Sequence, residues 1–91
     1  MEYLHREFDL AQDDVVEILL SGNAANVLLL DGDNFENYRQ GKPYKCFGGY
    51  ARTTPFRIDA PHAGRWHLVV DLGGGAGQVK ASSRVIHNQL A

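Results

Sequence analysis

Short segments in which apolar and polar residues alternate are the feature that most limits the folds open to this chain. In residues 56–60 the apolar positions alternate with Arg57 and Asp59, and residues 65–72 show the same alternation. A period of two residues is typical of a strand with one solvated face, whereas an amphipathic helix repeats every 3.6 residues. Because turn-forming residues separate the two segments at 61–64, the pattern predicts a β-hairpin.

Two further segments near the start of the chain alternate in the same way. Residues 4–10 place their leucines and phenylalanine on one face, and only Arg6 interrupts that apolar face. Asp13 and Asp14 then predict a turn into a second alternating segment, residues 15–21. The economical interpretation is a second hairpin.

Three other segments complete the predicted strands. Residues 26–30 are apolar at successive positions, which indicates a central strand covered on both faces. Residues 42–54 surround Gly48-Gly49 with aromatic residues and predict a strand, a tight turn and a strand. Residues 79–86 alternate again after the glycine-rich run 73–77, which we interpret as a flexible connection.

One helix is predicted, at about residues 33–41. Asp33 is a typical N-cap, and Glu36 three residues later completes a capping box. Gly41 suits the left-handed residue that ends a helix, and Pro43 prevents continuation. Phe35 and Tyr38 would share one helix face and fix the helix to a sheet.

About seven short strands and one short helix predict a mainly β fold. With no alternating helices to supply crossovers, we expect an antiparallel β-sandwich or a partly open barrel. A length of 91 residues fits one domain, 1–91, whose residues 87–91 we expect to form a frayed tail.

The composition favours a soluble cytoplasmic protein. Hydrophobic residues make up 44% of the chain, but no apolar run approaches the roughly 18 residues of a membrane-spanning helix. Residues 1–6 lack the basic flank and apolar stretch of a signal peptide. Cys46 is the only cysteine, which excludes an internal disulfide and agrees with a reducing compartment.

Charge is distributed unevenly along the chain although the net charge is only −2. Residues 1–36 hold nine acids and one arginine, and residues 37–91 hold eight bases and two acids. Neighbouring strands that complement each other across a sheet would explain this pattern. A bipolar surface that steers an anionic ligand or self-association is the alternative.

Motifs for catalysis, metals and cofactors are weak, and we predict none of the three. The run 73–77 lacks the Lys-Ser/Thr ending of a phosphate-binding loop. The histidines, at positions 5, 62, 67 and 87, show no spacing typical of a local metal site. His67 and Asp71 share a strand face, but four residues at about 3.3 Å each separate them by roughly 13 Å. Both would need partners from elsewhere.

The strongest binding candidate is the segment 38–57, which contains no acidic residue. Cations beside planar rings suit an anionic ligand with an aromatic part, such as a nucleotide. The predicted ligand-binding residues are Tyr38, Arg39, Tyr44, Lys45, Tyr50, Arg52 and Arg57. The net charge argues against duplex DNA as a partner. A plainer alternative is that the rings fill the core and the bases cover its solvated face.

Several pieces of the sequence together resemble the bacterial family of the domain of unknown function 1883. They are Asn26-Val27 with Leu29 and Asp31, Asn34-Phe35 with Tyr38 and Gly41, Gly48-Gly49, Pro61, Gly64, Trp66 and Asp71-Leu72-Gly73-Gly74-Gly75. The resemblance implies a compact β-rich module that occurs alone or beside domains of the Toll/interleukin-receptor type. It supplies no catalytic residues.

These observations favour a non-enzymatic binding or accessory module for a small anionic ligand or a protein partner. A structural domain that self-associates through its acidic and basic halves, as a homo-oligomer, is the alternative. An enzyme is the third hypothesis, and it would require distant residues to converge in a deep pocket.

Overall fold

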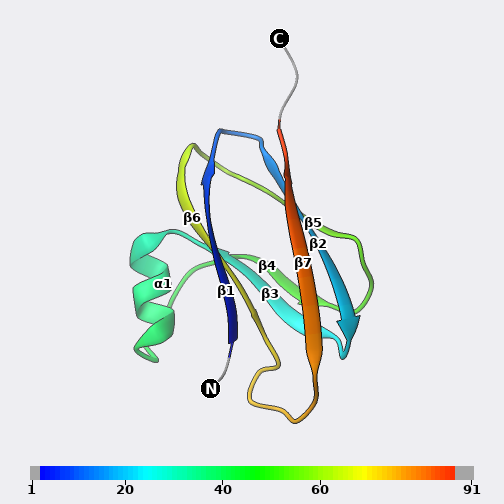
Figure 1. The fold of residues 1–91 in the computed structure, drawn as a ribbon. Helices are drawn as coiled ribbons and strands as arrows, with labels where there is room; N and C mark the ends of the chain where they lie inside the picture. Colours follow the sequence, from blue (N-terminus) through cyan, green and yellow to red (C-terminus); the bar gives the residue numbers. More distant parts are fainter. Residues whose placement is uncertain (1–2, 88–91) are drawn as a thin grey trace.

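The fold consists of seven strands and one helix, shown in the computed structural model of Figure 1, which describes residues 3–87. In chain order the elements are β1 (Tyr3–Leu10), β2 (Val15–Gly22), β3 (Ala25–Leu30), α1 (Gly32–Arg39), β4 (Phe47–Ala51), β5 (Phe56–Asp59), β6 (Gly64–Asp71) and β7 (Val79–Ile86). Of the predicted tail 87–91, residues 88–91 lie outside the described residues.

Two antiparallel sheets form a sandwich. The four-stranded sheet has the order β1-β6-β3-β4, and the three-stranded sheet has the order β5-β2-β7. Helix α1 lies against the outer face of the four-stranded sheet (Figure 1). The mainly β class is therefore confirmed, in its sandwich form. Within residues 3–87 there is no helix of the length and apolar character needed to cross a membrane.

The main core lies between the two sheets. Trp66, Leu29 and Ile18 are among its fully buried side chains, and they come from alternate positions of their strands. A second, smaller cluster packs Leu28, Leu30 and Val69 of the outer sheet face against the helix. Strand β3 contributes to both clusters, which confirms that it is a central strand covered on both faces.

Neither predicted hairpin exists. Strand β1 pairs with β6, and β2 pairs with β5 and β7, so the β1–β2 connection crosses between the sheets. The β5–β6 connection crosses back, from the three-stranded to the four-stranded sheet, at the same end of the sandwich. Backbone hydrogen bonds from Asp13 to Ala60 (3.0 Å) and from Ala60 to Asp14 (2.7 Å) tie the two crossings together. Alternation predicts a half-buried strand, but it does not specify the strand's partner.

The helix begins one residue before the predicted range, and its N-cap lies two residues before the predicted one. Its N-cap is Asp31 and not Asp33, because Asp31 Oδ1 accepts the backbone N–H of Asn34 at 2.9 Å. Asp33 lies within the first turn, where its negative charge interacts favourably with the positive end of the helix dipole. The helix ends at Arg39, and Gly41 has the expected positive φ of 73°.

Residues 42–54 contain one strand, β4, and not the predicted strand, turn and strand. Gly48 and Gly49 lie inside this strand with φ angles of 106° and 155°. A Cβ atom on Gly48 would lie 2.2 Å from the carbonyl oxygen of Val27. The glycine pair therefore permits close contact with β3, not a chain reversal.

Candidate functional site

The predicted binding residues do not form one continuous surface. Tyr38 is buried on the side of the helix that faces the sheet, and its hydroxyl donates a hydrogen bond to Asp71. Arg57 lies on the other sheet and bonds to Glu17 at 2.8 Å. These two residues therefore contribute to structure on opposite sides of the molecule.

The other predicted residues remain accessible near the helix and β4. The ring of Tyr44 packs edge-on against Tyr38 with 5.3 Å between centroids, and Tyr50 is 61% exposed. Arg39 pairs with Glu36 on its own helix. Among residues 3–87, the side chains of Lys45 and Arg52 make no hydrogen bond or ion pair.

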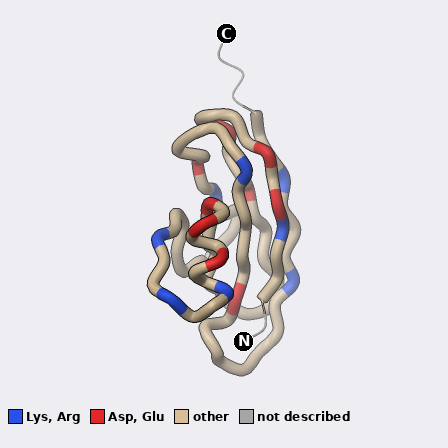
Figure 2. Tube along the Cα trace, turned by 90° about the vertical axis from the view of Figure 1, so that its left-hand side faces the viewer, with Lys and Arg blue, Asp and Glu red and all other residues tan. Residues whose placement is uncertain are grey.

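Opposite charges meet across neighbouring strands. Glu17 on β2 accepts hydrogen bonds from Arg57 on β5 and Arg84 on β7, at 2.8 and 2.7 Å. The bonds from Arg84 and Arg57 lower the pKa of Glu17 below its usual value. Arg65 on β6 contacts both Glu7 and an aspartate of β1. Acidic and basic positions are accordingly interleaved along the strands in Figure 2, which supports cross-strand complementarity.

Asp71 is the centre of a buried hydrogen-bond network. Its Oδ2 accepts from the hydroxyl of Tyr38 at 2.5 Å, and its Oδ1 accepts from Asn26 Nδ2 and Gly73 N, both at 2.9 Å. Burial and the Asp71 carboxylate raise the pKa of Tyr38 above its usual value. All four residues belong to the pieces on which the family resemblance rests, and the network ties helix, sheet and loop together.

A groove runs along the open side of the sandwich between β1 and β7. Two hollows, with volumes of about 230 and 670 Å³, share Leu4 and Val70 as lining residues. Both strands are sheet edges, and both lie on the near side of the molecule in Figure 1. We call this feature the edge groove; its apolar lining consists of Leu4, Leu68, Val70, Leu72, Val79 and Ala81.

Two cations border the edge groove. Arg6 lines the smaller hollow and Lys80 lines the larger one. Within the described residues, neither side chain has a hydrogen bond or ion pair. Arg6 occupies the position that interrupts the apolar face of β1 in the sequence, directly opposite Leu68. The one charged residue on the apolar face of β1 therefore lines the smaller hollow.

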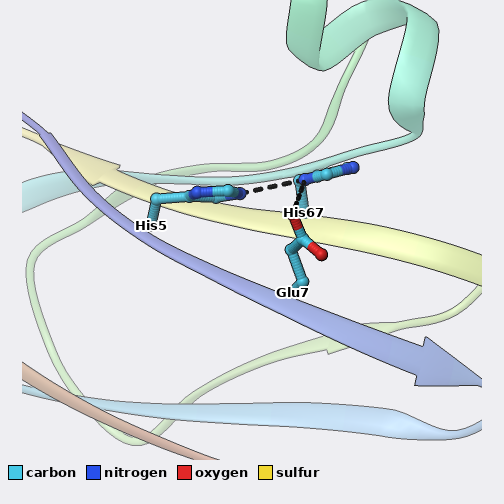
Figure 3. A group of neighbouring side chains, drawn as sticks. All are labelled: His5, Glu7 and His67. Carbon is cyan, nitrogen blue, oxygen red and sulfur yellow. Dashed lines mark hydrogen bonds and ion pairs between the residues drawn. The ribbon is translucent and has the colours of Figure 1, made fainter.

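Two histidines and one glutamate converge on the outer face of the four-stranded sheet (Figure 3). His5 Nε2 lies 2.9 Å from His67 Nδ1, and Glu7 Oε1 lies 3.7 Å from the same nitrogen of His67. Their ligand atoms all lie within 4.8 Å of one another. The register of β1 on β6 places Glu7 directly opposite His67 and His5 opposite the next residue on that face, Val69.

Phe35 fixes the planes of the two imidazoles. Its ring stacks on His5 at 4.2 Å and on His67 at 4.4 Å, with interplanar angles of 15° and 3°. Burial under this ring lowers the pKa of His67. Local sequence spacing does not reveal the pair, because it depends on the pairing of strands 62 residues apart. Alternation had already placed His5 and Glu7 together on the polar face of their strand.

Comparison with known proteins gives one family. The sequence model of the family described as "Domain of unknown function (DUF1883)" matches residues 1–89. No curated protein and no solved structure matches the chain.

Proposed function

The chain belongs to the DUF1883 family, and we propose that this member is a binding module for a small anionic ligand with an apolar part, held in the edge groove. The observation that carries the proposal is Arg6, an exposed cation that lines the smaller hollow beside the apolar residues and has no ion pair within residues 3–87.

The shape of the edge groove suits a small ligand. Ligand pockets typically enclose about 300–1,000 Å³ and are lined mainly by apolar side chains with a few polar groups. The larger hollow, at about 670 Å³, lies within that range, and the smaller one extends it along β1. An apolar body would bury Leu4, which is 45% exposed. That burial supplies a favourable hydrophobic contribution.

The charges beside the edge groove favour an anion. Arg57, Arg65 and Arg84 are paired with carboxylates, whereas Arg6 and Lys80 have no such partner in the part of the chain that the structure describes. A carboxylate or phosphate on the ligand would give each cation a charge-assisted hydrogen bond. Binding at such a groove needs no catalytic group, so we propose an accessory role and not catalysis.

A second location is supported by the accessible aromatic residues of the segment 38–57. Tyr44, Phe47 and Tyr50 are each more than 40% exposed. Lys45 and Arg52 are nearby in the sequence, and neither side chain has an ion pair among residues 3–87. Rings and cations of this kind suit a planar anion such as a nucleotide, or a protein partner. The two hollows described above lie elsewhere, which is why we place the ligand in the edge groove.

We also propose a bacterial cytoplasm as the setting. The resemblance implies a bacterial module, and Cys46 is an exposed, free cysteine. An exposed thiol is better tolerated in a reducing compartment.

The test compares two probes of equal chain length, decanoate and decanol, by thermal shift and by NMR titration. We expect decanoate to stabilise the protein more than decanol, with shifts confined to β1, β7 and the loop between β6 and β7. Arg6→Gln should remove most of the difference between the two probes. Arg52→Gln is the matched control, because it removes a cation that lies outside the edge groove.

The remaining outcomes distinguish the locations. If AMP stabilises the protein and Arg52→Gln or Tyr50→Ala abolishes the effect, the site lies in the segment 38–57. If neither decanoate nor AMP binds, the proposal of a small-molecule site is wrong. Arg6 would then act only as an inward-pointing charge that keeps the edge strand from pairing with other chains.

A further inference from the structure

We propose that His5, Glu7 and His67 form a binding site for a divalent zinc ion. The three side chains come from adjacent strands of a regular sheet, and Figure 3 shows His5 and Glu7 both directed toward His67. This site lies on the outer face of the sheet and does not depend on the ligand proposed for the edge groove.

The donor set matches zinc. Two imidazoles and one carboxylate are one of the three-ligand combinations that zinc sites use, and the fourth position is left for water or another ligand. Magnesium and calcium prefer sets made entirely of oxygen. Because two of the three donors here are nitrogens, the site should select zinc over magnesium.

The distances are close to those that a bound ion requires. At zinc–ligand distances of about 2.0–2.1 Å in a tetrahedron, neighbouring donor atoms lie roughly 3.3 Å apart. The two nitrogens lie 2.9 Å apart, and His67 Nδ1 lies 3.7 Å from Glu7 Oε1. To reach this separation the nitrogens would move apart by about 0.4 Å and this oxygen would approach by about 0.4 Å, and the remaining pair of donor atoms already lies within 4.8 Å.

The hydrogen bond between the two imidazoles indicates which hydrogen the zinc ion would replace. At present one ring donates its N–H to the lone pair of the other across 2.9 Å. Zinc would replace this shared hydrogen, which would move to the distal nitrogen of its own ring. No net proton release is needed for that tautomer change when both rings are neutral.

The surrounding residues hold the donors in place, as metal sites require. Phe35 stacks on both imidazoles and keeps them nearly coplanar. Arg65 donates from Nη1 to Glu7 Oε2 at 2.9 Å, which leaves Oε1 directed toward His67. Such supporting contacts typically change metal affinity by about 10–100-fold when removed.

The experiment measures zinc binding to the full chain by competition with a chromophoric chelator. We expect one zinc ion per chain and no competition from millimolar magnesium. His5→Ala and His67→Ala should each weaken binding at least about tenfold, and Arg65→Gln should weaken it about tenfold. His87→Ala is the control, because His87 contacts Asp14 and is not one of the three donors, so its loss should leave the affinity unchanged.

A measurement on the unaltered protein guards against variants that fail to fold. On addition of one equivalent of zinc, the NMR signals of His5 Nε2 and His67 Nδ1 should shift, and those of His62 should not. Absence of saturable zinc binding overturns the proposal. So does zinc binding whose imidazole shifts fall on His62 or His87 instead.

Discussion

Tyr38 and Asp71 are joined by a 2.5 Å hydrogen bond that links the helix to the end of β6, 33 residues further along the chain. Both side chains are more than 90% buried. This bond gives Tyr38 a structural role, because it holds the helix against the sheet. From the sequence, Tyr38 could be interpreted either as a core residue or as a ligand-binding residue.

Replacing Tyr38 by Phe should destabilise the protein by about 1.5–3 kcal/mol, because a buried carboxylate loses a charge-assisted donor while the ring remains. Urea denaturation measures the change in the free energy of unfolding. Tyr50→Phe is the matched control and should have no effect, since Tyr50 is largely exposed. Equal effects of both substitutions would show that the Tyr38–Asp71 bond contributes nothing specific.

The same bond should make the protein sensitive to alkali. The pKa of Tyr38 is raised in the folded state, so above about pH 10 the unfolded chain loses a proton that the folded protein keeps. The contribution of Tyr38 to stability is therefore fully present below that pH and falls as the pH rises further. Unfolding free energies at about pH 9 and pH 11 should differ less in Tyr38→Phe than in the unaltered protein.

Glu17 should produce the opposite dependence at acid pH. Hydrogen bonds from Arg84 and Arg57 lower its pKa below 4.5. Its contribution is therefore present above that value and is lost as the pH falls through the lower folded-state pKa. The melting temperature between about pH 5 and pH 3 should fall less steeply in Glu17→Gln. Glu36→Gln, on the exposed helix face, should follow the unaltered protein.

Two glycines provide a matched test of backbone strain. Gly48→Ala should destabilise the protein by more than about 1 kcal/mol, because φ is 106° and the new methyl group would overlap the carbonyl of Val27. Gly32 begins the helix, and a Cβ there would meet nothing within 4 Å. Gly32→Ala should therefore be neutral or stabilising by up to about 1 kcal/mol. Similar losses in both variants would contradict this account of β4.

Strand positions and faces could be predicted from the sequence because alternation depends on each residue's own environment. Strands β1, β2, β5, β6 and β7 and the shared face of His67 and Asp71 follow from that period, and the uninterrupted apolar run predicted the doubly covered β3. Strand partners could not be predicted, because alternation is the same whether the next strand is in the same sheet or the opposite one. Both hairpin predictions were wrong for this reason.

The candidate sites differ in the same way: one depends on the pattern within a single strand, and the other depends on strand pairing. Arg6 is visible in the sequence as a charge on an apolar face, so one border of the edge groove could have been identified early. The histidine pair could not, since His5 meets His67 only through the register of β1 on β6. Similarly, nothing local indicates that Arg57 bonds to Glu17, 40 residues away.

Salt should have little effect on the oligomeric state. Self-association between an acidic and a basic half requires unpaired charges, but Glu7, Asp9 and Glu17 already bond to arginines of their own chain. Sedimentation at about 50 mM and 500 mM NaCl should give the same mass, because only contacts between exposed charges weaken strongly over that range. Any association through the unpaired edges of β1 and β7 would rest on backbone hydrogen bonds and apolar contacts, and would persist in salt. A complex that dissociates as salt is added would instead support the self-associating domain.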